Sequence, residues 1–158
     1  MNGSQTAYKI FRRAYEKQMD GQIEEAIDLY KTSISLFPTP EAHTYLGWAY
    51  SMNGHYREAI SECMQAIELD PGYGNPYNDI GSYLMSLDEY DEAITWLEKA
   101  ISAERYEPRH YPYFNLGRVY ELKGMWWEAR EYYYRALEVN PDFEAAKLAV
   151  IKLTSLMN

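Results

Sequence analysis

The side chains that most often carry catalysis or bind metals are few in this sequence, and their spacing matches no known kind of site. There are three histidines, His43, His55 and His110, and one cysteine, Cys63. No His-x-x-x-His pair, Cys-x-x-Cys pair or glycine-rich phosphate loop occurs, so the sequence has the spacing of neither a zinc site nor a nucleotide site. It therefore predicts a protein that is not an enzyme and that uses no metal and no cofactor.

The charge of the chain limits the class of partner. The net charge of −9 at pH 7 comes from 24 acidic residues against 15 lysines and arginines. Nucleic acids and anionic membranes select proteins with clustered Lys and Arg, so this balance argues against both. No apolar run approaches the ~20 residues of a membrane span, and residues 1–6 lack the basic and apolar regions of a secretion signal. We therefore expect a cytoplasmic protein with no nucleic-acid partner and no membrane insertion.

The helices that would position a binding site are predicted by a sequence pattern that occurs four times. Ala26, Ala59, Ala93 and Ala129 lie in matching segments, at steps of 33, 34 and 36 residues. Other matching positions hold a small residue (Ala14, Gly47, Gly81, Gly117), a turn residue (Gly21, Gly54, Asp88, Gly124) and, in three copies, a closing proline (Pro38, Pro71, Pro141). Small residues let two helices approach to about 8–10 Å, and proline ends a helix. The pattern predicts four helical hairpins.

This pattern resembles the tetratricopeptide repeat (TPR) family, whose period is ~34 residues. The resemblance implies an all-α fold, a right-handed superhelical solenoid. It also implies a single domain over residues 7–157, with repeats at about 7–39, 40–73, 74–109 and 110–143 and an end helix at about 143–157. Isolated helices of this length are marginal in water, so each hairpin depends on its neighbours.

Three single positions add to this repeat pattern or depart from it. Cys63 occupies the second-helix position that the other repeats fill with Tyr30, Leu97 and Tyr133, so we expect it to be a buried core residue. His43 stands where later repeats place tyrosine, which favours a packing role. In the third repeat the closing proline position is Arg105, and two extra residues lengthen the loop that follows.

The family resemblance also implies where a ligand would lie. In TPR proteins the first helix of each hairpin lines the concave face. Carried onto this sequence, the positions that point into that groove include Phe11, Tyr15, Tyr45, Trp48, Asn78, Asp79, Asn115 and Arg118. Tyr45 and Trp48 would be apolar anchors, Asn115 would bind the backbone of an extended ligand, and Asp79 would accept from an amide or a basic side chain. The function implied is an adaptor that binds a peptide or a segment of a partner protein. The alternative is that Asn115 is only a frequent consensus residue and that the aromatic rings pack between helices.

A second hypothesis rests on aromatic residues of the second helices. Trp96 and Tyr132 share one register in adjacent repeats, and Trp127 is nearby, so they are expected on the convex surface. Exposed aromatic patches can form a contact between copies. The alternative function is therefore a self-associating scaffold for assembly of a larger complex, with the protein as a homo-oligomer. The competing interpretation of these rings is that they lie flat over neighbouring side chains.

Overall fold

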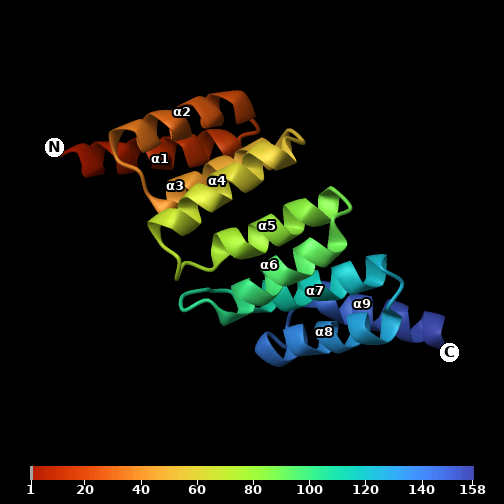
Figure 1. Ribbon diagram of the computed structural model, residues 1–158. Coiled ribbons are helices and arrows are strands. Elements are labelled where there is room, and N and C mark those ends of the chain that lie inside the picture. The colour runs from red at the N-terminus through yellow and green to blue at the C-terminus, as the bar shows by residue number, and fades with distance from the viewer. Residues whose placement is uncertain (1) are drawn as a thin grey trace.

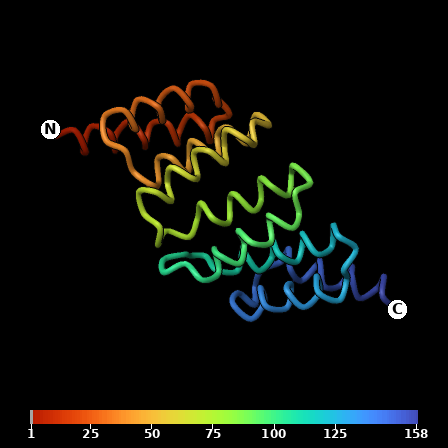
Figure 2. The backbone as a smooth tube through the Cα atoms, viewed as in Figure 1, coloured from red at the N-terminus to blue at the C-terminus, as the bar shows by residue number. Residues whose placement is uncertain are grey.

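The computed structural model describes residues 2–158, and this part of the chain forms nine α-helices. They are α1 (Gly3–Met19), α2 (Ile23–Leu36), α3 (Pro40–Met52), α4 (Tyr56–Leu69), α5 (Asn75–Ser86), α6 (Tyr90–Ser102), α7 (His110–Leu122), α8 (Trp126–Val139) and α9 (Glu144–Met157). The first eight helices pair into hairpins, and α9 packs on α8 (Figure 1). Figure 2 shows the hairpins following one another from the N-terminus to the C-terminus. The protein is an all-α superhelical solenoid.

A left-handed backbone conformation at each hairpin turn explains the recurring turn residue. Gly21, Gly54 and Gly124 have φ angles of 79°, 76° and 74°. In the third hairpin the same position is Asp88, with φ of 60°. Aspartate is one of the few side chains that adopt this region, and Asp88 accepts a hydrogen bond from the Tyr90 hydroxyl at 2.9 Å. The prediction of four equivalent turns is confirmed.

The two helices of a hairpin approach closely because small residues lie where they cross. A Cβ added to Gly81 would lie 2.5 Å from Cγ of Leu97, and one added to Gly117 would lie 2.5 Å from Cδ1 of Tyr133. Ala93 is fully buried on α6, and its carbonyl oxygen would lie 3.3 Å from a Cβ on Gly81. Larger side chains at these positions would force the helices apart.

We expect Ala93→Leu to lower the free energy of unfolding by about 1–3 kcal/mol, because the added atoms overpack the crossing of α5 and α6. Urea titration followed by circular dichroism measures the change. Ala145→Leu is the matched control, since Ala145 is exposed on α9, and it should shift stability by less than about 0.5 kcal/mol. Equal stability of Ala93→Leu and the wild type would contradict this packing.

The core is distributed along the solenoid. Three buried clusters follow one another, around Tyr30 in the first hairpin, around Leu84 and Leu97 in the middle, and around Tyr133 near α9. Cys63 belongs to the middle cluster and is fully buried, as predicted, and burial raises the pKa of its thiol. Each cluster includes residues of neighbouring hairpins or of α9, so the hairpins stabilise one another, as expected for a repeat protein.

The first helix starts earlier than the repeat pattern indicated. It begins at Gly3, four residues before the expected boundary at residue 7. Asn2 caps it, because its side-chain oxygen accepts from the Gln5 amide at 2.9 Å and the Gln5 side chain accepts from the Asn2 amide at 3.2 Å. This reciprocal cap satisfies free amides of the first turn, which extends the helix beyond the repeat.

The lengthened loop after α6 folds back onto the loop before α5. The Arg105 amide donates to the Gly72 carbonyl at 2.9 Å, and the Gly74 amide donates to the Arg105 carbonyl at 2.8 Å. Tyr106 follows and is only 4% exposed. A Cβ on Gly74 would lie 2.4 Å from Cβ of Tyr106, so only glycine leaves room for that side chain. The extra residues of the third repeat therefore supply a core side chain between repeats.

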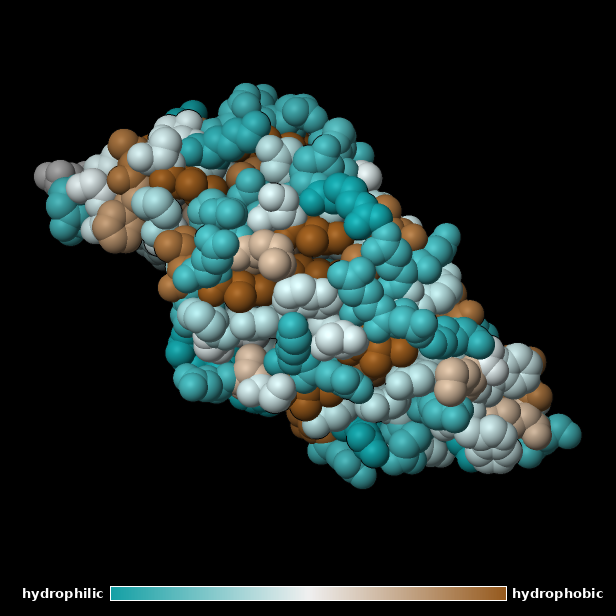
Figure 3. All heavy atoms as spheres, viewed as in Figure 1, coloured by the Kyte–Doolittle hydropathy of each residue, from teal (hydrophilic) through white to brown (hydrophobic). Residues whose placement is uncertain are grey.

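The surface in Figure 3 is mostly hydrophilic on the face viewed, and hydrophobic atoms reach it between α4 and α5. No helix within residues 2–158 has both the length and the apolar character of a membrane span.

Candidate functional site

The first helices of the hairpins form one continuous side of the solenoid. Helix α1 contacts α3, α3 contacts α5 and α5 contacts α7, in addition to the contacts within and between successive hairpins. Helices that pack this closely lie on the inner side of a curved stack. The groove positions expected from the sequence all lie on these four helices.

Aromatic rings form a ladder at the N-terminal end of this side. The ring of Tyr45 on α3 lies 5.1 Å from the ring of Phe11 and 5.8 Å from that of Tyr15, both on α1. On its other side Tyr45 meets Trp48 at 6.1 Å and an interplanar angle of 89°. Tyr15 and Trp48 are each 37% exposed. The ladder therefore joins two hairpins and presents apolar edges to solvent, so the rings both pack between helices and offer a binding surface.

A pocket of about 220 Å³ lies next to the ladder, between α3 and α5. It is lined by Thr44, Tyr45 and Trp48 of α3 and by Asn75 and Asp79 of α5. Burial raises the pKa of Asp79 from 3.8 to about 7, and the Asn78 side chain lowers it by a smaller amount. A carboxyl group at this position changes its charge near neutral pH.

Three further residues of the expected set form one hydrogen-bonded chain across α5 and α7. Nδ2 of Asn115 donates to Oδ1 of Asn78 at 3.0 Å, and Nη1 of Arg118 donates to Oδ1 of Asn115 at 3.3 Å. Both asparagines are 8% exposed. A side-chain amide has two N–H donors and an oxygen that accepts twice, so Asn115 keeps one donor and one acceptor site for a ligand. The sequence predicts a place in the groove for each of these residues separately, and the structure shows that hydrogen bonds link them.

The C-terminal end of the groove is covered by a residue that the repeat pattern did not indicate. Phe143, just before α9, packs its ring 4.6 Å from His110, 5.0 Å from Phe114 and 5.5 Å from Tyr111. Burial lowers the pKa of His110. These rings therefore pack on one another at the C-terminal end of the groove.

Two of the residues considered for self-association, Trp96 and Tyr132, pack on neighbouring rings. Trp96 packs on Tyr77, with ring centroids 6.0 Å apart, and Tyr132 stacks on Tyr120 at 5.3 Å. Trp127 and Tyr132 line one depression, whereas Trp96 lines another. Only Trp127 is strongly exposed, at 67%. Self-association stays a prediction that rests mainly on Trp127.

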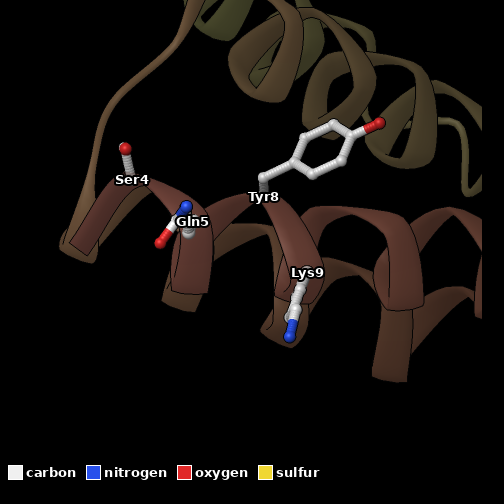
Figure 4. A pocket seen from close by; sticks show the side chains of 4 residues that line it. All are labelled: Ser4, Gln5, Tyr8 and Lys9. Atoms are coloured by element: carbon white, nitrogen blue, oxygen red, sulfur yellow. The ribbon is translucent and has the colours of Figure 1, made fainter. Parts of the chain in front are cut away.

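A second pocket lies near the N-terminus, but the side chains that line it do not point toward a common centre. It lies on α1 beside Ser4, Gln5, Tyr8 and Lys9. Figure 4 shows Tyr8 and Lys9 pointing to opposite sides of the helix. Within residues 2–158, no three His, Cys, Asp or Glu side chains come together as metal ligands. The inner side of the solenoid is therefore the better candidate site.

Known proteins share this repeat. Two family models, each described as a tetratricopeptide repeat, match residues 40–73 and 73–142. Anaphase-promoting complex subunit 6 of Arabidopsis thaliana is 29% identical over 148 residues, which are 89% of this chain and 26% of that protein. Small glutamine-rich tetratricopeptide repeat-containing protein 2 of Mycosarcoma maydis is 31% identical over 80 residues, which are 50% of this chain and 23% of that protein.

A solved structure of PilF from Pseudomonas aeruginosa has the same fold. It superposes with a TM-score of 0.90 and 22% sequence identity, over 99% of this chain and 71% of that chain. The chain spans about a quarter of the length of the two curated relatives. The family models together cover more than half of the chain, and the helices, turns and crossings agree with them. The protein belongs to the tetratricopeptide repeat family.

Proposed function

We propose that this protein is an adaptor that holds an extended segment of a partner protein along α1, α3, α5 and α7. The observation that carries the proposal is the convergence on one side of the solenoid of an exposed aromatic ladder, a pocket and a polar amide chain. Aromatic rings supply rigid apolar contacts, and a side-chain amide pairs with the donor and acceptor of a peptide group. Protein interaction is also the general role of the repeat proteins that it resembles.

In this arrangement the residues have separate roles. Tyr15, Tyr45 and Trp48 pack against apolar side chains of the segment. Asn115 uses its remaining donor and acceptor on the segment backbone, while Asn78 and Arg118 hold the amide in place. Phe11 supports Tyr45 from α1, at 5.1 Å between rings. Affinity then depends on a few residues in contact with the ligand rather than on the whole surface.

We expect Trp48→Ala to weaken peptide binding by roughly thirtyfold, which corresponds to about 2 kcal/mol, because it removes a central apolar contact. The probes are peptides selected on the wild-type protein from a displayed random 12-residue library, and isothermal titration calorimetry measures their Kd. Trp127→Ala is the matched control, since it deletes the same side chain from an exposed position outside the groove. Its affinity should stay within about twofold of the wild type.

The double variant Trp48→Ala, Asn115→Ala tests the groove as a whole. Its helical content by circular dichroism must match that of the wild type. If it then binds the selected peptides with undiminished affinity, the groove is not the binding site, and the surface around Trp127 becomes the leading candidate.

A further inference from the structure

The pocket between α3 and α5 contains a carboxyl group that has no cationic partner. Asp79 forms no ion pair or hydrogen bond with a Lys, Arg or His side chain among residues 2–158. Arg118, at one end of the amide chain, donates to Asn115. An ionised carboxylate in a partly desolvated pocket is costly unless an opposite charge or hydrogen bonds compensate it. A positive charge from a ligand would therefore stabilise the ionised form of Asp79.

The charge of Asp79 acts on five titratable groups, and all five are acids. They are Tyr45 of α3, Cys63 of α4, Tyr83 of α5, Tyr73 of the loop before α5 and Tyr106 of the loop after α6. Burial raises the pKa of each of these groups, so they are neutral at pH 7. A further acid, Glu41 of α3, acts on Tyr45 and Tyr73. Among residues 2–158, none of these groups supplies a positive charge to Asp79.

The walls of the pocket suit the stem of a long basic side chain. Tyr45 and Trp48 meet edge to face at 6.1 Å, so they offer differently oriented aromatic surfaces at one side of a 220 Å³ space. Lysine and arginine pack their methylene groups on apolar surface, and their charged ends are attracted to aromatic faces. The net charge of −9 further favours a basic ligand over an acidic one.

We propose that this pocket receives a lysine or arginine side chain of the bound segment, whose positive charge pairs with the carboxylate of Asp79. The inference rests on the proposed function and names one side chain of the ligand. It also has a consequence for protons. When Asp79 is protonated before binding, its O–H bond breaks as the ion pair forms, the electron pair stays on the carboxylate, and the proton leaves to solvent. Binding near pH 7 then releases up to one proton.

The test is a second selection from the displayed 12-residue library, performed at pH 8 on the wild type and on Asp79→Asn in parallel. We expect the wild-type peptides to share a Lys or Arg at a fixed distance from an apolar residue. The Asp79→Asn variant keeps the size of the side chain without its charge, and its peptides should lose that basic position. Binding of both peptide sets should still weaken with Trp48→Ala.

The outcomes separate the two proposals. Peptides that depend on Trp48 but lack a preferred basic position would overturn the lysine or arginine pocket and leave the groove intact. Peptides insensitive to Trp48→Ala would overturn the groove itself.

The pH dependence of the Kd is an independent test. It is measured with one selected peptide that has an acetylated N-terminus and no histidine. Protonation of Asp79 in the free protein competes with the ligand cation, so the Kd at pH 6 should be about tenfold weaker than at pH 8. With Asp79→Asn the Kd should be weak and the same at both pH values. A wild-type Kd that is unchanged between pH 6 and pH 8 would contradict the pairing with Asp79.

Discussion

Asp79→Asn is expected to raise the free energy of unfolding at pH 8 by up to about 4 kcal/mol. In the folded protein burial raises the pKa of Asp79 from 3.8 to about 7. Between these two values the native state binds the proton more tightly than the unfolded chain does, so stability falls as the pH rises through this window. Each unit of pKa difference corresponds to about 1.4 kcal/mol. Asparagine is neutral at every pH and avoids this loss.

Urea titrations of the wild type and the variant at pH 8 and pH 4.5 measure the effect. The advantage of Asp79→Asn should shrink to about 1 kcal/mol at pH 4.5, where most of the native carboxyl groups are protonated. Asp142→Asn is the control, because Asp142 is exposed and its replacement should change stability little at either pH. If the wild type and Asp79→Asn are equally stable at pH 8, the carboxyl group is not desolvated in the way the structure indicates.

This result bears directly on the proposed pocket. A residue retained for packing or folding would lower stability when replaced. Asp79→Asn is expected to do the opposite, and at the same time to abolish the preference for a basic residue in the ligand. Gain of stability together with loss of selectivity would mark Asp79 as a binding residue.

Tyr106→Ala is expected to lower the free energy of unfolding by about 3–5 kcal/mol, the range typical of a large buried aromatic side chain. Tyr106 is 4% exposed and packs against Gly74, in the loop between repeats two and three. Its removal leaves a cavity at the junction between these repeats, and the pocket of Asp79 lies at the same junction. Thermal and urea unfolding followed by circular dichroism measure the loss.

Tyr134→Ala is the matched control for that experiment. Tyr134 lies on α8 and is 46% exposed, so its truncation should cost less than about 1 kcal/mol. A loss of the same size for Tyr106→Ala would show that the loop is not part of the core.

Most of the fold could be predicted because it repeats. The turn residues Gly21, Gly54, Asp88 and Gly124 and the crossing residues Gly81 and Gly117 recur at fixed spacing, so each copy supports the interpretation of the others. Features that occur only once in the chain could not be predicted from a repeated pattern. The burial of Tyr106 and the position of Phe143 over His110 arise in segments that depart from the repeat.

The candidate site was predictable in its residues but not in its chemistry. The family resemblance assigned Tyr45, Asp79 and Asn115 to the groove, and they lie on the first helices α3, α5 and α7. Their role in binding stays a prediction. The pKa of Asp79 is raised by its burial in the folded protein, and the bond from Asn115 to Asn78 depends on how α5 and α7 are aligned. Both follow from the packing between repeats, which spacing along the chain does not specify.

The position of the pocket across two hairpins has a mechanical consequence. One wall belongs to α3 of the second hairpin and the other to α5 of the third. In a solenoid each hairpin contacts mainly its neighbours, so the softest motion is bending at the junctions between them. Such bending widens or narrows this pocket, whereas the hairpins that form its walls keep their shape. A side chain that contacts both walls therefore restricts bending at this junction, and its binding fixes the angle between the second and third hairpins.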